Sequence, residues 1–210
     1  MSLQTRPTRQ AKLAAGERRQ QLVSIAIEQI AKKGFEGLRF EEVAKGAGIN
    51  NATLYYHFPS KEALIQQVVS HLTEELKKRR HRPKDVPATA REDLRLEFED
   101  VRALLRTHPK IFIVLTELSM RGLHDPFISK MEKTRDRCWR EHLSGIIRRG
   151  IEQGLFRKDI NLEATVTALM GQIKGIGYHT TLGKRKRDEV DEMIMEIARQ
   201  VEHWLAGGRT

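Results

Sequence analysis

Apolar residues recur every three or four positions along most of the chain, and strict alternation of apolar and polar residues is absent. This spacing places apolar side chains on one face of a helix. It is strongest towards the end of the chain, at Val190, Met193, Ile194, Ile197, Ala198, Val201, Trp204 and Leu205. The pattern predicts an all-α fold with about nine helices.

Four helices are expected near the beginning of the chain. The pattern and its end signals place them at residues 17–33, 40–46 and 51–57, with a fourth from Lys61. Gly34 ends the first, and Gly48 permits a tight turn because glycine adopts positive φ without steric cost. Asn50 and Ser60 are the expected N-caps of the third and fourth helices.

Later helix starts carry their own signals: a capping box at Thr89 and Glu92, Pro109, the Asp125-Pro126 pair and Asn161. A stretch that is polar and basic, Lys77 to Pro83, predicts a helix end followed by a loop. A second apolar stripe, at Val166, Leu169, Met170 and Ile173, marks the helix that Asn161 opens.

The net charge of the chain indicates which kind of partner it can bind. The 210 residues include 38 Lys and Arg against 28 Asp and Glu, a formal charge of +10. A nucleic acid or an anionic membrane surface would suit such a protein. Cys138 is the only cysteine, so no intrachain disulfide forms and the cytoplasm is the expected location. We expect neither a secretion signal nor a membrane span, which requires ~20 apolar residues.

The second and third helices, joined by a glycine turn, match a helix-turn-helix, whose second helix enters the major groove of DNA. Val43, Ala44 and Leu54 are expected to pack between these helices. Polar side chains around them can bind base edges or phosphates. The predicted DNA-binding residues are Arg39, Asn50, Asn51, Thr53, Tyr55, Tyr56, His57 and Lys61.

Four segments together resemble the N-terminal signature of the TetR family of bacterial transcription regulators: Gly34-Phe35-Glu36, Val43-Ala44, the run from Gly48 to Phe58, and Lys61-Glu62-Ala63-Leu64. Two positions depart from it. Arg39 stands where the family usually has a Ser or Thr cap, and Asn50 stands where it usually has Ser. Asn50 is an equivalent cap, whereas Arg39 is available to a phosphate.

The resemblance implies a ligand-responsive transcription regulator, expected to be a repressor, that binds a palindromic operator as a homodimer and is released by a small molecule. We expect a flexible basic arm at residues 1–16, a helix-turn-helix DNA-binding domain at 17–62, and a ligand-binding and dimerisation domain at 63–210. The apolar stripes of the last two helices are wide enough to form the dimer interface. The interface residues expected there are Val166, Leu169, Met170, Ile173, Ile194, Ile197, Val201 and Trp204.

A ligand pocket is expected among helices four to eight, with apolar walls and a few polar groups. Its predicted residues are Phe112, Leu115, Phe127, Met131, Trp139, His142 and Tyr178. Most of them are equally suited to an ordinary core. Cys138 and His142 have a metal-ligand spacing, but two ligands are too few for a metal site.

Other functions are less well supported. The chain has no Gly-x-Ser-x-Gly elbow and no phosphate-binding loop, so we expect neither an enzyme nor a cofactor. The glycines between Gly171 and Gly177 have the wrong spacing for a nucleotide loop and follow a helix. The alternative that remains is a helical protein that binds an anionic membrane surface or a protein partner. A polar exposed face on the third helix would argue against it.

Overall fold

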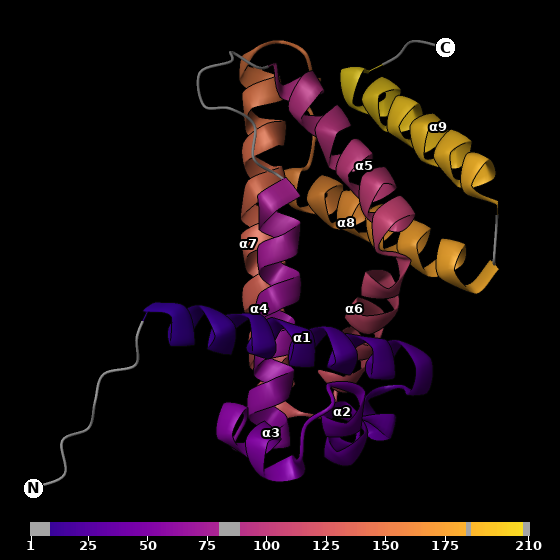
Figure 1. Cartoon of the computed structure of the whole chain (residues 1–210). Coiled ribbons are helices and arrows are strands. Elements are labelled where there is room, and N and C mark those ends of the chain that lie inside the picture. Colours follow the sequence, from indigo (N-terminus) through magenta and orange to yellow (C-terminus); the bar gives the residue numbers. More distant parts are fainter. Residues whose placement is uncertain (1–8, 80–88, 184–185, 208–210) are drawn as a thin grey trace, which may run out of the picture. The chain divides into compact units, whose positions relative to one another are not determined.

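The computed structural model describes residues 9–79, 89–183 and 186–207 (Figure 1). In these ranges it contains nine α-helices, one 3-10 helix and no strand, which confirms the predicted all-α class. The helices are α1 (Arg9–Lys33), α2 (Phe40–Gly46), α3 (Asn51–His57), α4 (Lys61–Arg79), α5 (Ala90–Thr107), α6 (Pro109–Arg121), α7 (Pro126–Glu152), α8 (Leu162–Gly183) and α9 (Arg187–Ala206), and the 3-10 helix η1 (Phe35–Gly37) follows α1.

The chain divides into two compact units, Met1–Thr73 and Glu74–Thr210. The division falls inside α4, later than the 62/63 boundary that we expected from the sequence. We refer to these as unit 1 and unit 2. No helix among the described residues is both long and apolar enough to cross a lipid bilayer.

Unit 1 is built on α1, which packs against η1 and α2, while α2 packs against α3. Its core consists of side chains with no exposed surface, among them Leu22, Val43, Leu54 and Phe58. Helix α1 begins at Arg9, earlier than the expected start at residue 17. Part of the predicted basic arm is therefore helical, and residues 1–8 of that arm lie outside the described residues.

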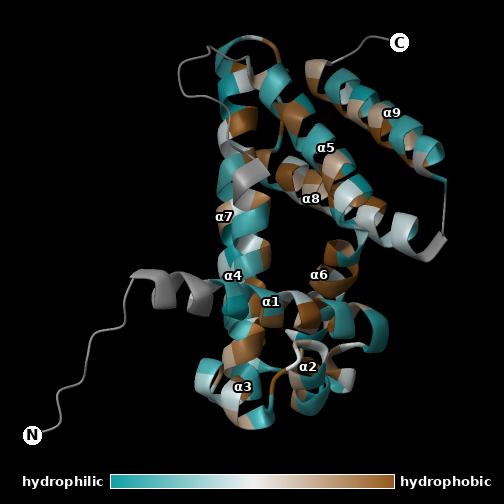
Figure 2. Ribbon diagram, in the orientation of Figure 1, coloured by the Kyte–Doolittle hydropathy of each residue, from teal (hydrophilic) through white to brown (hydrophobic). Residues whose placement is uncertain are grey.

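Unit 2 contains α5 to α9. Helix α5 packs against α9, α7 and α6, and α8 packs against both α6 and α7. Arg95 bonds Glu202 at 3.3 Å and Arg106 bonds Asp191 at 3.1 Å, so α5 and α9 run in opposite directions. The apolar residues of these helices face one another and their polar residues face outward (Figure 2).

The capping residues predicted from the sequence form their bonds. Asn50 Oδ1 accepts from the Thr53 N–H at 2.8 Å, and Thr89 and Glu92 form a reciprocal capping box. Asp125 caps α7, and Asn161 Oδ1 accepts from the Ala164 N–H at 3.0 Å. Each bond satisfies a backbone donor that the first turn of a helix leaves without an intrahelical acceptor. The starts of α2 to α8 were thus correctly predicted.

Candidate DNA-binding interface

A short turn joins α2 to α3, and its geometry depends on one glycine. Gly48 has a φ of 67°, a conformation that costs a side-chain-bearing residue free energy. On either side of this turn Val43, Ala44 and Leu54 are almost fully buried, as predicted. The two helices are therefore fixed against each other by a small apolar core, which leaves the opposite side of α3 facing solvent.

The exposed face of α3 is polar. Asn51 is exposed, and Tyr56 has 84% of its surface accessible although Leu54, two residues earlier, has none. Tyr55 is 52% exposed, and its ring packs on Phe40 of α2 with the ring centroids 5.1 Å apart. The side chains of Asn51, Tyr55 and Tyr56 are therefore available to a partner that offers hydrogen-bonding groups.

Asn50 and Thr53 are already bonded to each other. The Asn50 Oδ1 accepts from both the backbone N–H and the hydroxyl of Thr53, at 2.8 and 2.9 Å. Among the residues predicted to bind DNA, these two thus hold the start of α3. Their oxygens are engaged in the cap, and the side-chain amide nitrogen of Asn50 is what remains to donate outward.

His57 lies at the last position of α3, beside Arg19 of α1. Arg19 Nη1 donates to the His57 carbonyl at 3.2 Å, and its guanidinium lies over the ring of Phe58, 4.6 Å from the centroid. Burial lowers the pKa of His57 from its ordinary 6.5, and the charges of Arg19 and Arg18 lower it further. Arg19 thereby ties the end of α3 to α1.

The two cations predicted to contact phosphate lie at the edges of this surface. Lys61 is half-buried, and its Nζ donates to the Phe35 carbonyl at 3.3 Å. Arg39 is exposed immediately before α2, where its side chain makes no capping bond. Of these two side chains, Arg39 is the more accessible.

Two basic residues near this surface, Arg19 and Lys45, were not predicted from the sequence. Arg19 contacts the end of α3, and Lys45 is exposed in the last turn of α2, just before the Gly48 turn. The position of Lys45 beside the turn was a usable signal, because loops next to a recognition helix often contact phosphates. The role of Arg19 depends on a contact between residues far apart in sequence.

Unit 2 brings together only part of the predicted ligand pocket. The Trp139 Nε1 donates to Glu97 Oε2 at 3.3 Å, and His142 Nε2 lies 2.8 Å from Glu97 Oε1. Phe112 packs against Gly177, where an added Cβ would lie 2.1 Å from its Cδ1. Leu115 and Met131 are half-buried, whereas Phe127 and Tyr178 are exposed.

Glu97 is a further residue that was not predicted from the sequence. It lies on the buried face of α5 and is only 6% exposed. An acid on an otherwise apolar stripe, between Leu94 and Val101, was the available signal, since carboxylates are rarely buried without hydrogen-bonding partners. Unit 2 also has a hollow of about 540 Å³ away from Glu97. None of the predicted pocket residues lines it.

The possible metal pair has no support in the structure. Cys138 is exposed and His142 bonds Glu97. Among the described residues, no group of three or more His, Cys, Asp and Glu side chains is placed to hold a metal ion.

The residues predicted for a dimer interface lie mostly inside unit 2. The buried members are Val166, Leu169, Met170, Ile173, Ile194 and Val201. Because they pack within the chain, they have almost no surface left to bury against a second subunit, and their place in an interface stays a prediction that this burial does not favour. Ile197 is half-buried and Trp204 is 39% exposed, so these two remain accessible.

Comparison with known proteins agrees with a helix-turn-helix in this part of the chain. The sequence model for bacterial regulatory proteins of the tetR family matches residues 22–68. The HTH-type transcriptional repressor NicS of Pseudomonas putida is 30% identical over 178 residues, 75% of this chain and 74% of NicS. The HTH-type transcriptional repressor KstR2 of Mycobacterium tuberculosis is 27% identical over 146 residues, 70% of this chain and 72% of KstR2.

Solved structures show the same fold. A transcriptional regulator from Saccharomonospora viridis, in complex with choline, has a TM-score of 0.76 and 26% identity, and the match covers 88% of this chain and 96% of that one. The KstR2 structure from Mycobacterium tuberculosis has a TM-score of 0.67 at 22% identity and covers 91% of this chain and 94% of that one.

Proposed function

This chain belongs to the TetR family of bacterial regulatory proteins, and on that premise we propose that α3 is the helix that recognises its operator. The protein is a DNA-binding transcription regulator and not an enzyme. The observation that carries the proposal is the exposed polar face of α3, above all Tyr56, on a helix that Leu54 fixes to the core. A membrane-binding helix would instead expose apolar side chains.

The side chains divide into two groups by what they can contact. Asn51 and Tyr56 are on the open face of α3 and are proposed to contact base edges, where an amide or a hydroxyl can distinguish bases. Tyr55, Arg39 and Lys61 are proposed to contact phosphates, which fix the register without specifying sequence. Asn50 and Thr53 support this face by holding the start of the helix.

His57, Lys45 and Arg19 complete the proposed interface. His57 ends α3, and its carbonyl is held by Arg19. Lys45 and Arg19 are exposed cations at the two sides of α3, on α2 and α1. We expect both to add to the electrostatic attraction of DNA, which acts on every sequence alike.

A homodimer is proposed through the exposed faces of α8 and α9, in place of the buried stripes. On α8 the residues Ala164, Ala168 and Gly171 are exposed at helical spacing, and their small size would let a partner helix approach closely. On α9 the accessible residues Ile197 and Trp204 supply apolar surface. Two subunits would place two α3 helices ~34–36 Å apart on a palindromic operator.

The effector is proposed to be a small molecule that binds unit 2. The transcriptional regulator from Saccharomonospora viridis was solved in complex with choline, which supports a small-molecule effector for this chain. Trp139 and His142, which converge on buried Glu97, are the predicted pocket residues best placed to respond to a ligand. Phe112, Leu115, Phe127, Met131 and Tyr178 stay predictions. Binding would favour a dimer whose α3 helices no longer match the operator spacing.

Repression is the proposed mode of regulation, since NicS and KstR2 are both described as repressors. A protein that binds a bacterial operator works where the chromosome lies, so we also propose a cytoplasmic location.

The test begins with a screen of genomic fragments upstream of neighbouring genes for one that binds the protein. On that fragment, Tyr56→Ala should weaken specific binding by about tenfold or more, since a good base contact contributes on the order of 1–3 kcal/mol. Met120→Ala, which removes a large exposed side chain from unit 2 and from neither the predicted pocket nor the proposed dimer face, is the matched control. Affinities are measured by fluorescence anisotropy against the operator and against a scrambled duplex.

Lys61→Ala should weaken binding to both duplexes and flatten the dependence of affinity on salt, because it removes a phosphate contact. If Tyr56→Ala and Met120→Ala have the same operator affinity as the unchanged protein, α3 does not recognise the operator.

A further inference from the structure

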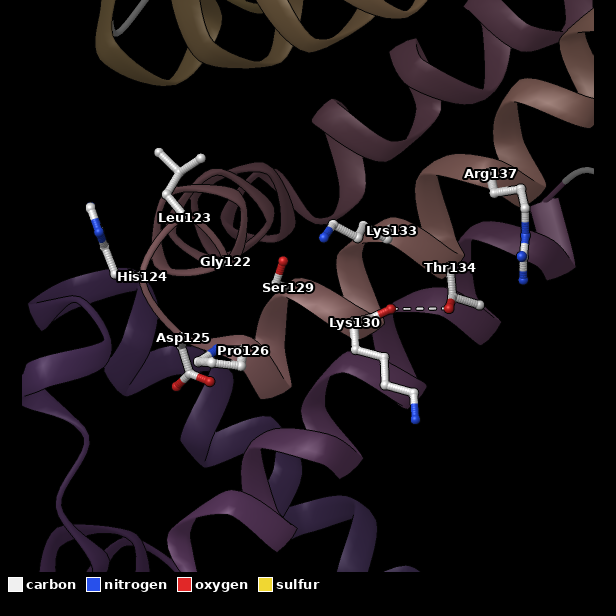
Figure 3. A pocket seen from close by; sticks show the side chains of 10 residues that line it. All are labelled: Gly122, Leu123, His124, Asp125, Pro126, Ser129, Lys130, Lys133, Thr134 and Arg137. Atoms are coloured by element: carbon white, nitrogen blue, oxygen red, sulfur yellow. Dashed lines mark hydrogen bonds between the residues drawn. The ribbon is translucent and has the colours of Figure 1, made fainter.

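A hollow of about 540 Å³ opens on unit 2 where the turn after α6 meets the first turns of α7 (Figure 3). Its size is within the range of pockets that hold small molecules. The side chains that give it its character are His124, Ser129, Lys130, Lys133, Thr134 and Arg137. None of them was predicted to bind a ligand, and none belongs to the DNA-binding surface of unit 1.

Three cations line this hollow from one helix. Lys130, Lys133 and Arg137 are spaced three and four residues apart, so they lie along one face of α7. All three are exposed, and none forms an ion pair with any residue that the structure describes. Like charges at this spacing repel one another and destabilise a helix. This repulsion is weak between exposed side chains, on the order of a few tenths of a kcal/mol per pair, and a bound anion would relieve it.

Two acids of α7 that stand next to these cations in sequence are engaged elsewhere. Glu132 bonds Arg135 and accepts from the Ser119 hydroxyl at 2.9 Å. Asp136 accepts from Lys174 of α8 at 3.0 Å and lies 3.6 Å from Arg140. Glu132 and Asp136 thus pair with residues outside the hollow, and the acid of α7 that remains near it is the exposed Glu141, one turn beyond Arg137.

Asp125 is the one acid among the residues that line the hollow, and its carboxylate is occupied as well. Its Oδ1 accepts from the backbone N–H groups of Phe127 and Ile128, at 2.9 and 3.2 Å. Its Oδ2 lies 3.6 Å from Arg121 Nε. The helix start and Arg121 together offset its charge, so the hollow remains positive.

We propose that this hollow binds a small molecule that carries a diphosphate group. The three cations extend over about 10 Å of helix, since each residue adds about 1.5 Å, which is longer than a single carboxylate can bridge. A diphosphate offers several oxygens and more than one negative charge, and Arg and Lys are the usual residues that bind it. Ser129 lies between these cations and the turn, where its hydroxyl can donate to a phosphate oxygen (Figure 3).

The test is calorimetric titration of the full-length protein with sodium pyrophosphate, at fixed ionic strength kept with sodium chloride. The double variant Lys133→Ala/Arg137→Ala should raise the Kd about tenfold or more, because it removes two charge-assisted contacts. The matched control is Arg148→Ala/Lys158→Ala, which removes the same two charges from exposed positions outside the hollow. The control should leave the Kd within about twofold of the unchanged protein.

Binding of pyrophosphate to the hollow goes beyond the proposed function, and the two can be tested separately because operator binding is measured on its own. Equal weakening by both double variants, or no heat from pyrophosphate with the unchanged protein, would overturn the site while operator binding stands. If the first double variant binds pyrophosphate normally but operator DNA poorly, the hollow contacts nucleic acid and the inference is wrong. Choline chloride, a cation, should produce no binding that depends on Lys133 and Arg137.

Discussion

Asn50 determines how firmly α3 begins. Its Oδ1 accepts two bonds from Thr53 at the start of a helix of only seven residues, which has few bonds of its own. Asn50→Ala should lower the free energy of unfolding by about 1 kcal/mol and weaken operator binding, because the first turn loses its cap. Asn50→Ser keeps a capping oxygen and should change both much less. Urea unfolding and fluorescence anisotropy measure the two effects, and identical results for Ala and Ser would contradict the role of the cap.

His57 should titrate below its ordinary pKa of 6.5, because burial and the charges of Arg19 and Arg18 disfavour its protonated form. The unfolded chain then binds the proton more readily than the folded one. Above pH 6.5 the contribution of His57 to the free energy of unfolding is therefore fully present. It is lost as the pH drops from 6.5 through the lowered pKa. NMR titration of the imidazole measures the midpoint, and Arg19→Ala should move it back towards 6.5. A midpoint at or above 6.5 in the unchanged protein would be inconsistent with this account.

Individual residues of the site were predictable where helical spacing alone decides exposure. Once Leu54 is placed in the core, the period of a helix puts Tyr56, two residues later, on the opposite side. Asn51 lies three residues before Leu54, near the same face, and is exposed at the first position of α3. The bond between Thr53 and Asn50 was only half predictable, since the backbone cap has a sequence signal and the hydroxyl bond has none. Glu97 was missed because its two described partners, Trp139 and His142, come from a helix far along the chain.

Helices α6 and α8 approach so closely that only glycine fits at one point. A Cβ on Gly177 would lie 2.1 Å from Phe112 Cδ1, well inside van der Waals contact. Gly177→Ala should therefore lower the free energy of unfolding by about 1–3 kcal/mol. Gly145→Ala in α7 is the control, since its Cβ would meet Arg149 Nη1 at 3.7 Å and alanine favours a helix by up to ~1 kcal/mol. Thermal unfolding distinguishes the two, and equal stability of both variants would show that the contact relaxes.

Helices were predicted well where local signals mark their ends. Helices α2 and α3 have the expected bounds because glycines and caps stand at their limits. The start of α1 at Arg9 was missed because no apolar spacing precedes residue 17. The stripes of α8 and α9 were correctly recognised as buried surface, but a stripe does not reveal whether the same chain or a second one covers it. Here α5, α6 and α7 cover them.

The whole protein is expected to be a dimer, and one charged side chain introduced into the proposed interface should be enough to dissociate it. Gly171 is exposed on α8 and has open space around it, so glutamate fits there in a single chain. Gly171→Glu should reduce the mass measured by light scattering from two chains to one, because it would place a charge in the proposed interface. Gly145→Glu puts the same residue on α7 and should remain dimeric. A dimer that persists in Gly171→Glu would exclude this face.

At the scale of the whole molecule, the sequence predicted two regions but not where they divide. The boundary lies within α4, where apolar spacing continues from Leu64 to Leu72 without a break in composition. The basic hollow was also not predictable, since it depends on which acids α7 pairs with α6 and α8. Local patterns specify helices, whereas hollows arise from contacts between them.

The pairing of α5 with α9 has a consequence for how the protein is made. Unit 1 packs helices that are neighbours in sequence, whereas Arg95 must find Glu202 at the far end of the chain. Local contacts form fast and distant ones slowly. During synthesis the operator-binding part is thus expected to fold first. The apolar side of α5 stays exposed to solvent until α9 has left the ribosome and can pack against it. A nascent chain stalled before α9 would be a target for chaperones and proteases.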